Sequence, residues 1–238
     1  MKNLKTSSYS QSSKVLFFGR SECDHSKSLL NILNSKGFKV QAVMSHKRGE
    51  KLTEDICGWS GEYIISFRSL FFLPKSLIDR ANIAAVNFHP GPPEYPGSGC
   101  INYALYDGVK DYGVTAHIMN EKIDNGNIIE VRRFRVKVDD DLTSLLSKTH
   151  KELYKLCSDF IELMSVTSEN FIHQKISSAK HEKWNGNASL ISDLDKLQII
   201  NLDITKKELE RVIRATYTDA YPPKIELHGY DFYLSLKK

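Results

Sequence analysis

The sequence predicts an α/β protein in which helices flank a central, mainly parallel sheet, followed by a small C-terminal helix and β-hairpin. Residues 15–18 form an apolar run that stops at Gly19, and residues 26–35 carry leucine and isoleucine at helical spacing. Gly37 closes that helix, and a second strand begins within residues 39–44. This strand–helix–strand order implies two parallel strands joined by a right-handed crossover.

Further strands are expected along the first part of the chain. Residues 63–67 and 83–88 are apolar enough for buried strands, and Pro74 opens a short helix between them. Residues 113–120 alternate apolar and polar side chains, and residues 127–138 form a longer strand whose charged face is solvated. These segments extend the sheet begun by the first strand–helix–strand unit.

A long amphipathic helix is expected at residues 142–164, where apolar side chains recur at helical spacing. Beyond it, residues 177–197 are expected to be irregular, residues 206–215 a short helix, and residues 224–234 a hairpin turning at HGYD. The expected divisions of the chain are a flexible N-terminal tail (1–13), one large domain (14–175) and a C-terminal helix and β-hairpin segment (176–238).

Composition excludes several classes of protein. The chain has 238 residues, 41% of them hydrophobic, which is enough for one large core. Its net charge of +4 is not gathered into a basic stripe, so no nucleic-acid partner is expected. The four cysteines form no CxxC pair, no apolar leader follows the first lysines, and no apolar run is long enough to span a membrane. We therefore expect a cytoplasmic globular protein.

The segment from Asn87 to Asn127 carries the side chains suited to catalysis. Asn87 and His89 alternate around Phe88 at the end of an apolar strand, so both point to one side of the edge where α/β sheets bind ligands. Asp124 lies in a loop between two strands. Alone, a strand-end histidine is more often structural, and an Asp before Asn-Gly usually forms a turn.

The order of four separated motifs favours the catalytic interpretation. They are LFFLPKSLI at residues 70–78, N-x-H-P and P-P-x-Y within residues 87–95, GVT-x-H-x-M at residues 113–119, and D-x-G-x-I at residues 124–128. Together they resemble the folate-dependent formyltransferase family over residues 14–165. The resemblance implies a Rossmann-like catalytic domain, 10-formyltetrahydrofolate as the formyl donor, and no metal.

The resemblance also implies individual roles. Asn87, His89 and Asp124 match the family's catalytic asparagine, histidine and aspartate. His89 would take the proton of an attacking amine, Asn87 would donate to the oxyanion, and Asp124 would orient the imidazole. Thr115 and His117 match GVT-x-H and are expected to support the site. The expected donor-binding residues, some of which are alternatively core side chains, are Ser66, Phe67, Arg68, Leu70, Phe72, Asn120, Ile123 and Asp124.

The nucleotide-sugar N-formyltransferases within this family are the most similar, on the loop HPGPPEYPGSG and the segment RVIRATYTDAYPPKIELHGYDFYL. Methionyl-tRNA formyltransferase carries a larger C-terminal domain, and glycinamide ribonucleotide transformylase usually ends near the long helix. The implied acceptor is a dTDP-linked amino-dideoxysugar, with 4-amino-4,6-dideoxyglucose favoured, for O-antigen and lipopolysaccharide synthesis. The alternatives are another small amine, such as glycinamide ribonucleotide, or a non-catalytic folate- or nucleotide-binding module.

The acceptor is expected at the turn after the first strand, where free N–H groups at a helix start suit phosphate. Two bland alternatives stay open: Ser21 or Asp24 caps the helix, and Tyr103 and Leu105 are core residues. Neither Trp59 nor Trp184 has a pattern that assigns it a role. The expected substrate-binding residues are Arg20, Ser21, His25, Ser26, Lys27, Tyr95, Ser98, Asn102 and Tyr103.

The terminal hairpin is dense in aromatic side chains, among them Tyr221, Tyr230, Phe232 and Tyr233. An isolated two-stranded hairpin is only marginally stable in water, so these side chains need a surface to pack on. We expect a homodimer formed through the hairpin, and burial against the same chain is the alternative.

Overall fold

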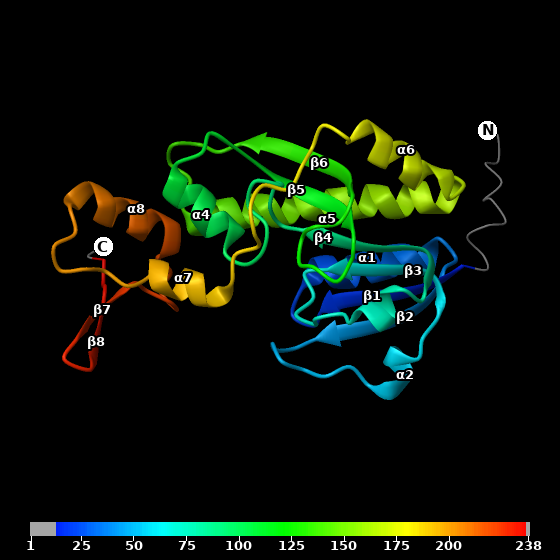
Figure 1. The fold of residues 1–238 in the computed structure, drawn as a ribbon, viewed down its shortest axis with the longest axis horizontal. Helices are drawn as coiled ribbons and strands as arrows, with labels where there is room; N and C mark the ends of the chain where they lie inside the picture. Colours follow the sequence, from blue (N-terminus) through cyan, green and yellow to red (C-terminus); the bar gives the residue numbers. More distant parts are fainter. Residues whose placement is uncertain (1–12, 237–238) are drawn as a thin grey trace.

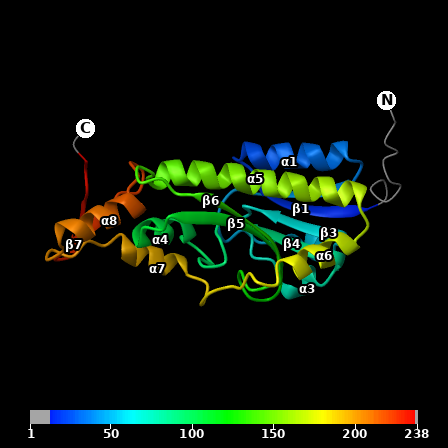
Figure 2. The ribbon, with the colours of Figure 1, turned by 90° about the horizontal axis from the view of Figure 1, so that it is seen from above.

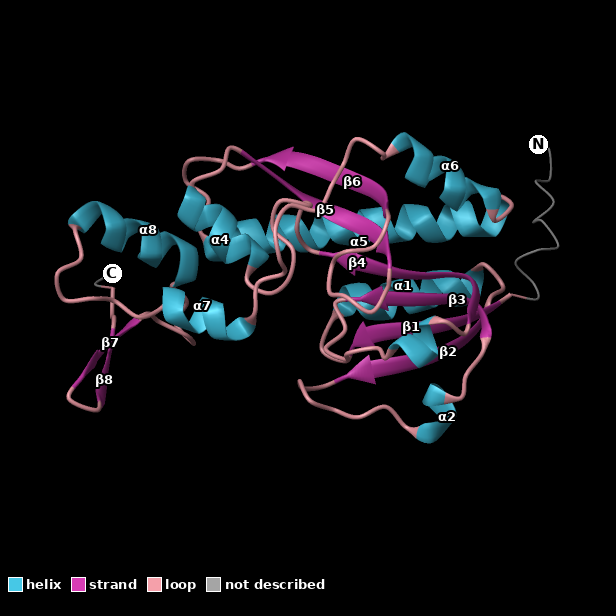
Figure 3. Ribbon diagram, viewed as in Figure 1, coloured by secondary structure: helices cyan, strands magenta, loops and turns pink. Residues whose placement is uncertain are grey.

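The protein is described from a computed structural model, which covers residues 13–236. A six-stranded sheet has the order β2–β1–β3–β4–β5–β6 (Figures 1 and 3). Strands β1 to β4 are parallel to one another, and β5 is antiparallel to both of its neighbours, β4 and β6. This confirms the mainly parallel sheet. The strands are β1 (Lys14–Arg20), β2 (Lys39–Ser45), β3 (Gly61–Phe67), β4 (Ala81–His89), β5 (Asp111–Ile118) and β6 (Ile128–Arg135). The expected flexible tail lies outside the described residues, except for Ser13.

One face of the sheet is covered by α1 (Asp24–Ser35) and α5 (Leu142–Val166), which run side by side in Figure 2. Alternate strand residues point to this face, so Val15 and Phe17 of β1 pack with helix residues such as Leu29 and Leu153. A capping box between Asp141 and Ser144 begins the 25-residue α5.

The opposite face packs against two short helices, α2 (Glu54–Cys57) and α3 (Lys75–Ile78). Leu16 and Phe18 of β1 point to this side and pack in a second cluster with Trp59 and Leu77. None of the helices within residues 13–236 is long and apolar enough to cross a membrane.

A third cluster joins α4 (Cys100–Asp107) to α8 (Lys206–Thr216), with α4 residues packed on Ala215. The prediction that residues 177–197 are irregular is wrong at both ends, because α6 (Asn170–Ser178) and α7 (Ile191–Leu197) occupy part of them. Helix α7 buries no residue and begins where Asp193 accepts from the Leu190 amide, so it has no apolar pattern to detect. The expected division at residue 175 falls inside α6.

The terminal hairpin forms as expected from β7 (Lys224–Leu227) and β8 (Tyr230–Tyr233). His228 and Gly229 join the strands, and both have positive φ, the mirror-image turn that suits a two-residue hairpin loop. The hairpin projects away from the main sheet in Figure 1, and its first residue bonds to the segment after α7 through the Ile200 amide.

Candidate active site

A pocket of about 530 Å³ opens at the carboxyl ends of β3 and β4. Its walls come from these strand ends, from the loop after β3, from residues 97–100, and from the loop between β5 and β6. The last loop begins beside β4, where the Met119 amide donates to the Ala85 carbonyl and extends the pairing of β4 with β5. This position, at the carboxyl ends of parallel strands, is the usual ligand site of an open α/β sheet.

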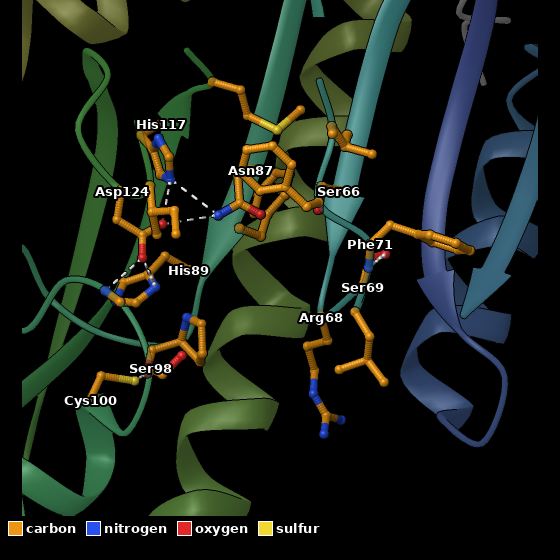
Figure 4. A pocket seen from close by; sticks show the side chains of 18 of the residues that line it. Ser66, Arg68, Ser69, Phe71, Asn87, His89, Ser98, Cys100, His117 and Asp124 are labelled. Carbon is orange, nitrogen blue, oxygen red and sulfur yellow. Dashed lines mark hydrogen bonds and ion pairs between the residues drawn. The ribbon is translucent and has the colours of Figure 1, made fainter. Parts of the chain in front are cut away.

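Four polar groups surround the buried carboxylate of Asp124, and Figure 4 labels the three side chains among them. Oδ2 lies 3.1 Å from Nδ1 of His89 and accepts from the Gly97 amide at 2.8 Å. Oδ1 accepts from Nδ2 of Asn87 at 3.3 Å and lies 3.2 Å from Nε2 of His117. The structure therefore brings together the three residues expected to be catalytic, and adds His117 and a backbone amide.

Backbone geometry places Asp124 in this position. Its φ is +42°, in the left-handed region where aspartate is one of the few tolerated side chains. Two residues later, a Cβ on Gly126 would lie 1.8 Å from the Ile118 carbonyl oxygen, so the loop passes too close to β5 for any side chain. The strained turn and this close approach together aim the carboxylate at the histidines.

His89 has a hydrogen-bond acceptor opposite each ring nitrogen. Nδ1 faces the Asp124 carboxylate, and Nε2 lies 2.9 Å from the Tyr95 carbonyl. A carboxylate and a carbonyl only accept, so both nitrogens carry a proton in this arrangement. Burial lowers the pKa of His89, but the charge and hydrogen bond of Asp124 and the Tyr95 carbonyl outweigh it and raise the pKa above its ordinary value.

The pKa of Asp124 shifts in the opposite direction. Burial raises it, but the charge of His89 and the hydrogen bonds from His117 and His89 hold it well below its ordinary range. The lowered pKa favours the carboxylate form of Asp124, and its charge in turn favours the protonated form of His89.

The sequence predicted only a supporting role for His117. In the structure its ring directly contacts Asn87 and Asp124. Its Nδ1 donates to the Ile118 carbonyl at 2.9 Å, which leaves Nε2 facing the Asn87 amide at 3.1 Å and Asp124. Thr115 has the expected supporting position: its hydroxyl donates to the Gly91 carbonyl at 2.7 Å and ties β5 to the loop after His89.

Three arginines, Arg20, Arg48 and Arg68, line the other end of the pocket. None of them forms an ion pair with a carboxylate of residues 13–236; Arg68 donates instead to the sulfur of Cys23 at 3.2 Å. Burial, then the charges of Arg68, His25 and Arg20, lower the pKa of His150 in this wall to about 3. This end of the pocket is therefore strongly electropositive and suited to an anionic ligand.

Part of the pocket wall is apolar. It consists of Phe71, Phe72, Leu73, Ile78 and Met119. Phe72 is 69% exposed at the pocket mouth, where a flat ring of a ligand has access to it. Within the described residues, no cluster of three or more His, Cys, Asp or Glu side chains has the arrangement of a metal site.

Most of the expected donor-binding residues lie in the pocket wall. Phe67 is an exception, because its side chain is fully buried in the core and only its backbone is near the site. The residues named from sequence that do line the pocket are Arg20, Ser66, Arg68, Leu70, Phe72, Asn87, His89, Ser98, His117, Asn120, Ile123 and Asp124.

Other residues expected to bind substrate have partners within the protein. Ser21 donates to the Ser45 carbonyl, and Ser26 accepts from the Arg20 amide, so both brace the turn after β1. His25 stacks on Tyr154, and Lys27 extends into solvent beside Asp24. Neither Ser21 nor Asp24 caps α1, whose N-cap is Cys23 and has no side-chain cap.

The loop residues Tyr95, Asn102 and Tyr103 also do not line the pocket. The Tyr95 hydroxyl donates to Asp107 while its carbonyl contacts His89, and Asn102 donates to the Ala215 carbonyl at 2.8 Å. Tyr103 lies on α4 beside Gly99, and Leu105 is buried as the core alternative proposed. The Tyr95 and Asn102 side chains therefore bond to other parts of the protein, outside the pocket wall.

Sequence patterns gave no indication of Trp184, which contacts both histidines. Its ring centroid lies 5.0 Å from that of His117 and 5.8 Å from that of His89, with both pairs edge-to-face. The indole N–H donates to the Gly126 carbonyl at 2.8 Å. A lone tryptophan in a polar segment has no periodicity, and only the fold brings it to the site.

An Asn–His–Asp cluster in a pocket on an open α/β sheet is suited to group transfer. Residues 12–161 match the model of the formyl transferase family, and the chain belongs to that family. The resemblance recognised in the four motifs is therefore confirmed.

Individual relatives share parts of the chain. Methionyl-tRNA formyltransferase of Lysinibacillus sphaericus is 32% identical over 102 residues, which are 42% of this chain and 33% of that protein. The matched region thus spans less than half the length of the curated relatives described.

Solved structures share the fold over nearly the whole chain. A 4-N formyltransferase from Francisella tularensis has a TM-score of 0.71 and 20% identity, covering 94% of this chain and 97% of that chain. An N-formyltransferase from Helicobacter canadensis, in complex with folinic acid and dTDP-3-aminofucose, has a TM-score of 0.67 and 16% identity, covering 91% and 85%.

Proposed function

We propose that this chain transfers a formyl group from 10-formyltetrahydrofolate to the amino group of a nucleotide-linked amino sugar. The observation that carries the proposal is the buried Asp124 carboxylate, held by His89, His117 and Asn87 at one end of a pocket with an electropositive far end. In the reaction, the amine nitrogen forms a bond to the formyl carbon, the bond from that carbon to the donor nitrogen breaks, and one proton passes from the amine to the donor nitrogen.

The protonated state of His89 sets the order of proton movements. With both ring nitrogens protonated, His89 acts first as an acid. Its Nε2 proton leaves the Tyr95 carbonyl and passes to the departing nitrogen. The neutral ring then takes the proton of the attacking amine, which returns the site to its starting state. The sequence predicted only the second of these steps. Asp124 keeps the ring oriented throughout, because its own pKa is too low for it to be protonated.

Asn87 supplies a hydrogen bond to the oxyanion that develops on the formyl group. Its Nδ2 lies 3.1 Å from Nε2 of His117 and 3.3 Å from Asp124, and the second distance is long for a bond to a charged group. One of these N–H bonds can therefore turn to a stronger acceptor in the transition state.

The residues present fit the proposed donor. The apolar wall formed by Phe71, Phe72 and Met119 suits one face of a pteridine ring, and Ser66 and Asn120 offer polar groups at its edge. When bound, the donor would supply the activated formyl group. The arginine end suits the anionic parts of the ligands, which are the diphosphate of a nucleotide sugar or the carboxylates of a folate tail.

The acceptor class is supported by the extent of the structural likeness. The Francisella 4-N formyltransferase matches 94% of this chain, a share that reaches beyond the sheet domain into the C-terminal segment. The Helicobacter enzyme was solved with a dTDP amino sugar. We favour dTDP-4-amino-4,6-dideoxyglucose as the acceptor, with a role in O-antigen or lipopolysaccharide synthesis in the cytoplasm, where the four free cysteines would stay reduced.

The test is direct. The protein is incubated with 10-formyltetrahydrofolate and, separately, dTDP sugars bearing an amine at C3 or C4, glycinamide ribonucleotide, and methionyl-tRNA. We expect a mass gain of one formyl group on a dTDP sugar, and none with the Asp124→Asn protein. Product only with glycinamide ribonucleotide or methionyl-tRNA would assign a different acceptor, and folate binding without any product would favour the non-catalytic alternative.

We also infer that residues 176–238 form a C-terminal segment through whose hairpin two copies pair. Tyr230, Phe232 and Tyr233 are 72%, 55% and 62% exposed on a two-stranded ribbon that has little surface of its own to bury them. Sedimentation at micromolar concentration should give a dimer, and Phe232→Glu should give a monomer. A monomer before substitution would contradict this inference.

A further inference from the structure

The segment between α6 and α7 passes over the catalytic loop and makes contacts along its length. This segment, residues 182–190, is the yellow stretch that crosses the strands in Figure 1. The catalytic loop, residues 90–99, follows His89 and carries the Tyr95 carbonyl and the Gly97 amide, both of which contact the His89–Asp124 pair. The geometry of the pair therefore depends on where this loop is held.

Backbone bonds join the two segments at three points. The Asn185 amide donates to the Pro93 carbonyl at 2.9 Å, the Ser189 amide to the Pro96 carbonyl at 3.0 Å, and the Ser98 amide to the Ser189 carbonyl at 2.8 Å. A Cβ on Gly97 would lie 2.4 Å from the Ser189 carbonyl oxygen, so the segments are in close contact beside the Gly97 amide that binds Asp124.

An ion-pair bridge joins the same two segments on the outer side. Arg133 of β6 forms a two-point contact with Glu94 of the loop, at 3.1 and 3.0 Å, and binds Glu182 at 2.7 Å. The guanidinium fork matches a carboxylate in this geometry, so the loop and the start of the segment are both fixed to β6.

Trp184 provides the contact at the centre of the crossing. Its indole lies edge-to-face against His117 and His89, and its N–H holds the Gly126 carbonyl two residues after Asp124. His89 and His117 are only 3% and 2% exposed. Trp184 is not among the residues that line the pocket, so its contacts are with the histidines and not with the cavity.

We propose that Trp184 is a positioning residue: it holds His89 and His117 against Asp124 and keeps water from the pair, while residues 182–190 fix the catalytic loop. This proposal deepens the formyl transfer proposed above and rests on it for its kinetic test. Because Trp184 contacts His89 and His117 but lies outside the pocket wall, its loss should affect the chemical step and leave binding nearly unchanged.

The kinetic test compares Trp184→Ala and Trp184→Phe with the parent. We expect Trp184→Ala to lower kcat by about 100-fold, as small displacements of reacting groups do, with KM for donor and acceptor little changed. Trp184→Phe keeps an aromatic edge and should recover part of the loss. Trp59→Phe is the matched control, since Trp59 is buried in the opposite-face cluster and should leave both constants unchanged. A kcat within about threefold of the parent in Trp184→Ala would overturn the proposal.

A second test needs no substrate and no Ala variant. The chain has two tryptophans, so Trp59→Phe leaves Trp184 as the only indole. A protonated imidazole in contact with an indole quenches its emission, so the emission of this protein should rise with pH as His89 loses its proton, with a midpoint above about 6.5. His89→Asn in the same protein should remove that transition. Emission with the same pH profile in this protein and in its His89→Asn form would overturn the proposal, even if no acceptor is ever formylated.

Discussion

At one end of the pocket the Asp124 carboxylate is surrounded by donors, whereas at the other end three arginines have no carboxylate partner among residues 13–236. The first end is organised before any ligand arrives, because every oxygen of the carboxylate is already bonded. The arginine end carries positive charge that no carboxylate of residues 13–236 pairs with, so it is available to an anionic ligand. Reaction geometry and ligand affinity are thus assigned to different parts of the same cavity, and substitutions at the two ends should have different kinetic effects.

The largest effect is expected from Asp124→Asn. This change keeps the shape but removes the charge that raises the pKa of His89, so kcat should fall by about 10³-fold. Asp111→Asn, at an exposed pair with Arg135, is the matched control and should leave kcat unchanged. A rate close to that of the parent in Asp124→Asn would show that the buried carboxylate is not needed for the chemistry.

Gly126→Ala tests whether the loop that carries Asp124 can accommodate a side chain at position 126. The new methyl group would overlap the Ile118 carbonyl, so the loop carrying Asp124 must move, at a cost of about 1–3 kcal/mol in the free energy of unfolding. Urea denaturation measures this cost, with a parallel loss of formyl transfer. Gly58→Ala has no contact under 3.3 Å and serves as the comparison. Equal stability of the two variants would mean that this loop is not held as described.

Arg20→Ala tests the unpaired end. Loss of a charge-assisted contact to an anionic ligand should raise KM for one substrate by about tenfold and change kcat little, which is the reverse of the Asp124 effect. Measuring KM for donor and acceptor separately identifies which ligand the arginines hold. Arg135→Ala, on an arginine already paired with Asp111, is the control. A fall in kcat with constant KM would contradict the assignment of ligand affinity to the arginine end of the pocket.

The smallest effect is expected in the pH dependence of stability. The pKa of His89 is raised on folding, so its contribution is complete below about pH 6.5 and is lost as the pH rises through the folded-state value. The pKa of Asp124 is lowered, so its contribution is lost as the pH falls below about 4. Thermal unfolding across this range should show both declines. The alkaline decline should be missing in His89→Asn and kept in His46→Asn, whose histidine is exposed; an unchanged profile in His89→Asn would contradict this account.

Sequence patterns predicted the sheet well because its strands are apolar and its crossovers follow fixed chirality. The strand at Val15–Phe18 and the helix before Gly37 were found from periodicity alone, and the long α5 from its apolar spacing. Helix α7 was missed because it buries none of its residues, so no apolar periodicity marks it.

Site residues were predictable where a motif lies at the end of a strand. They were unpredictable where a side chain bonds to a residue far away in the sequence. Asn87 and His89 are in the last three residues of β4, so their shared direction was visible in the alternation. The role of Asn102, in contrast, depends on the carbonyl of Ala215, a residue far along the chain. The protonation of His89 also depends on the Tyr95 carbonyl, and backbone groups leave no trace in residue identity.

The segment that fixes the catalytic loop comes late in the sequence. During synthesis, the sheet strands and α5 leave the ribosome before residues 182–190 do, and N-terminal parts fold first. A nascent chain that ends before Trp184 has the histidines and the carboxylate, but not the contacts that fix them. Catalytic competence should therefore appear abruptly as the last quarter of the chain folds, rather than growing with the sheet.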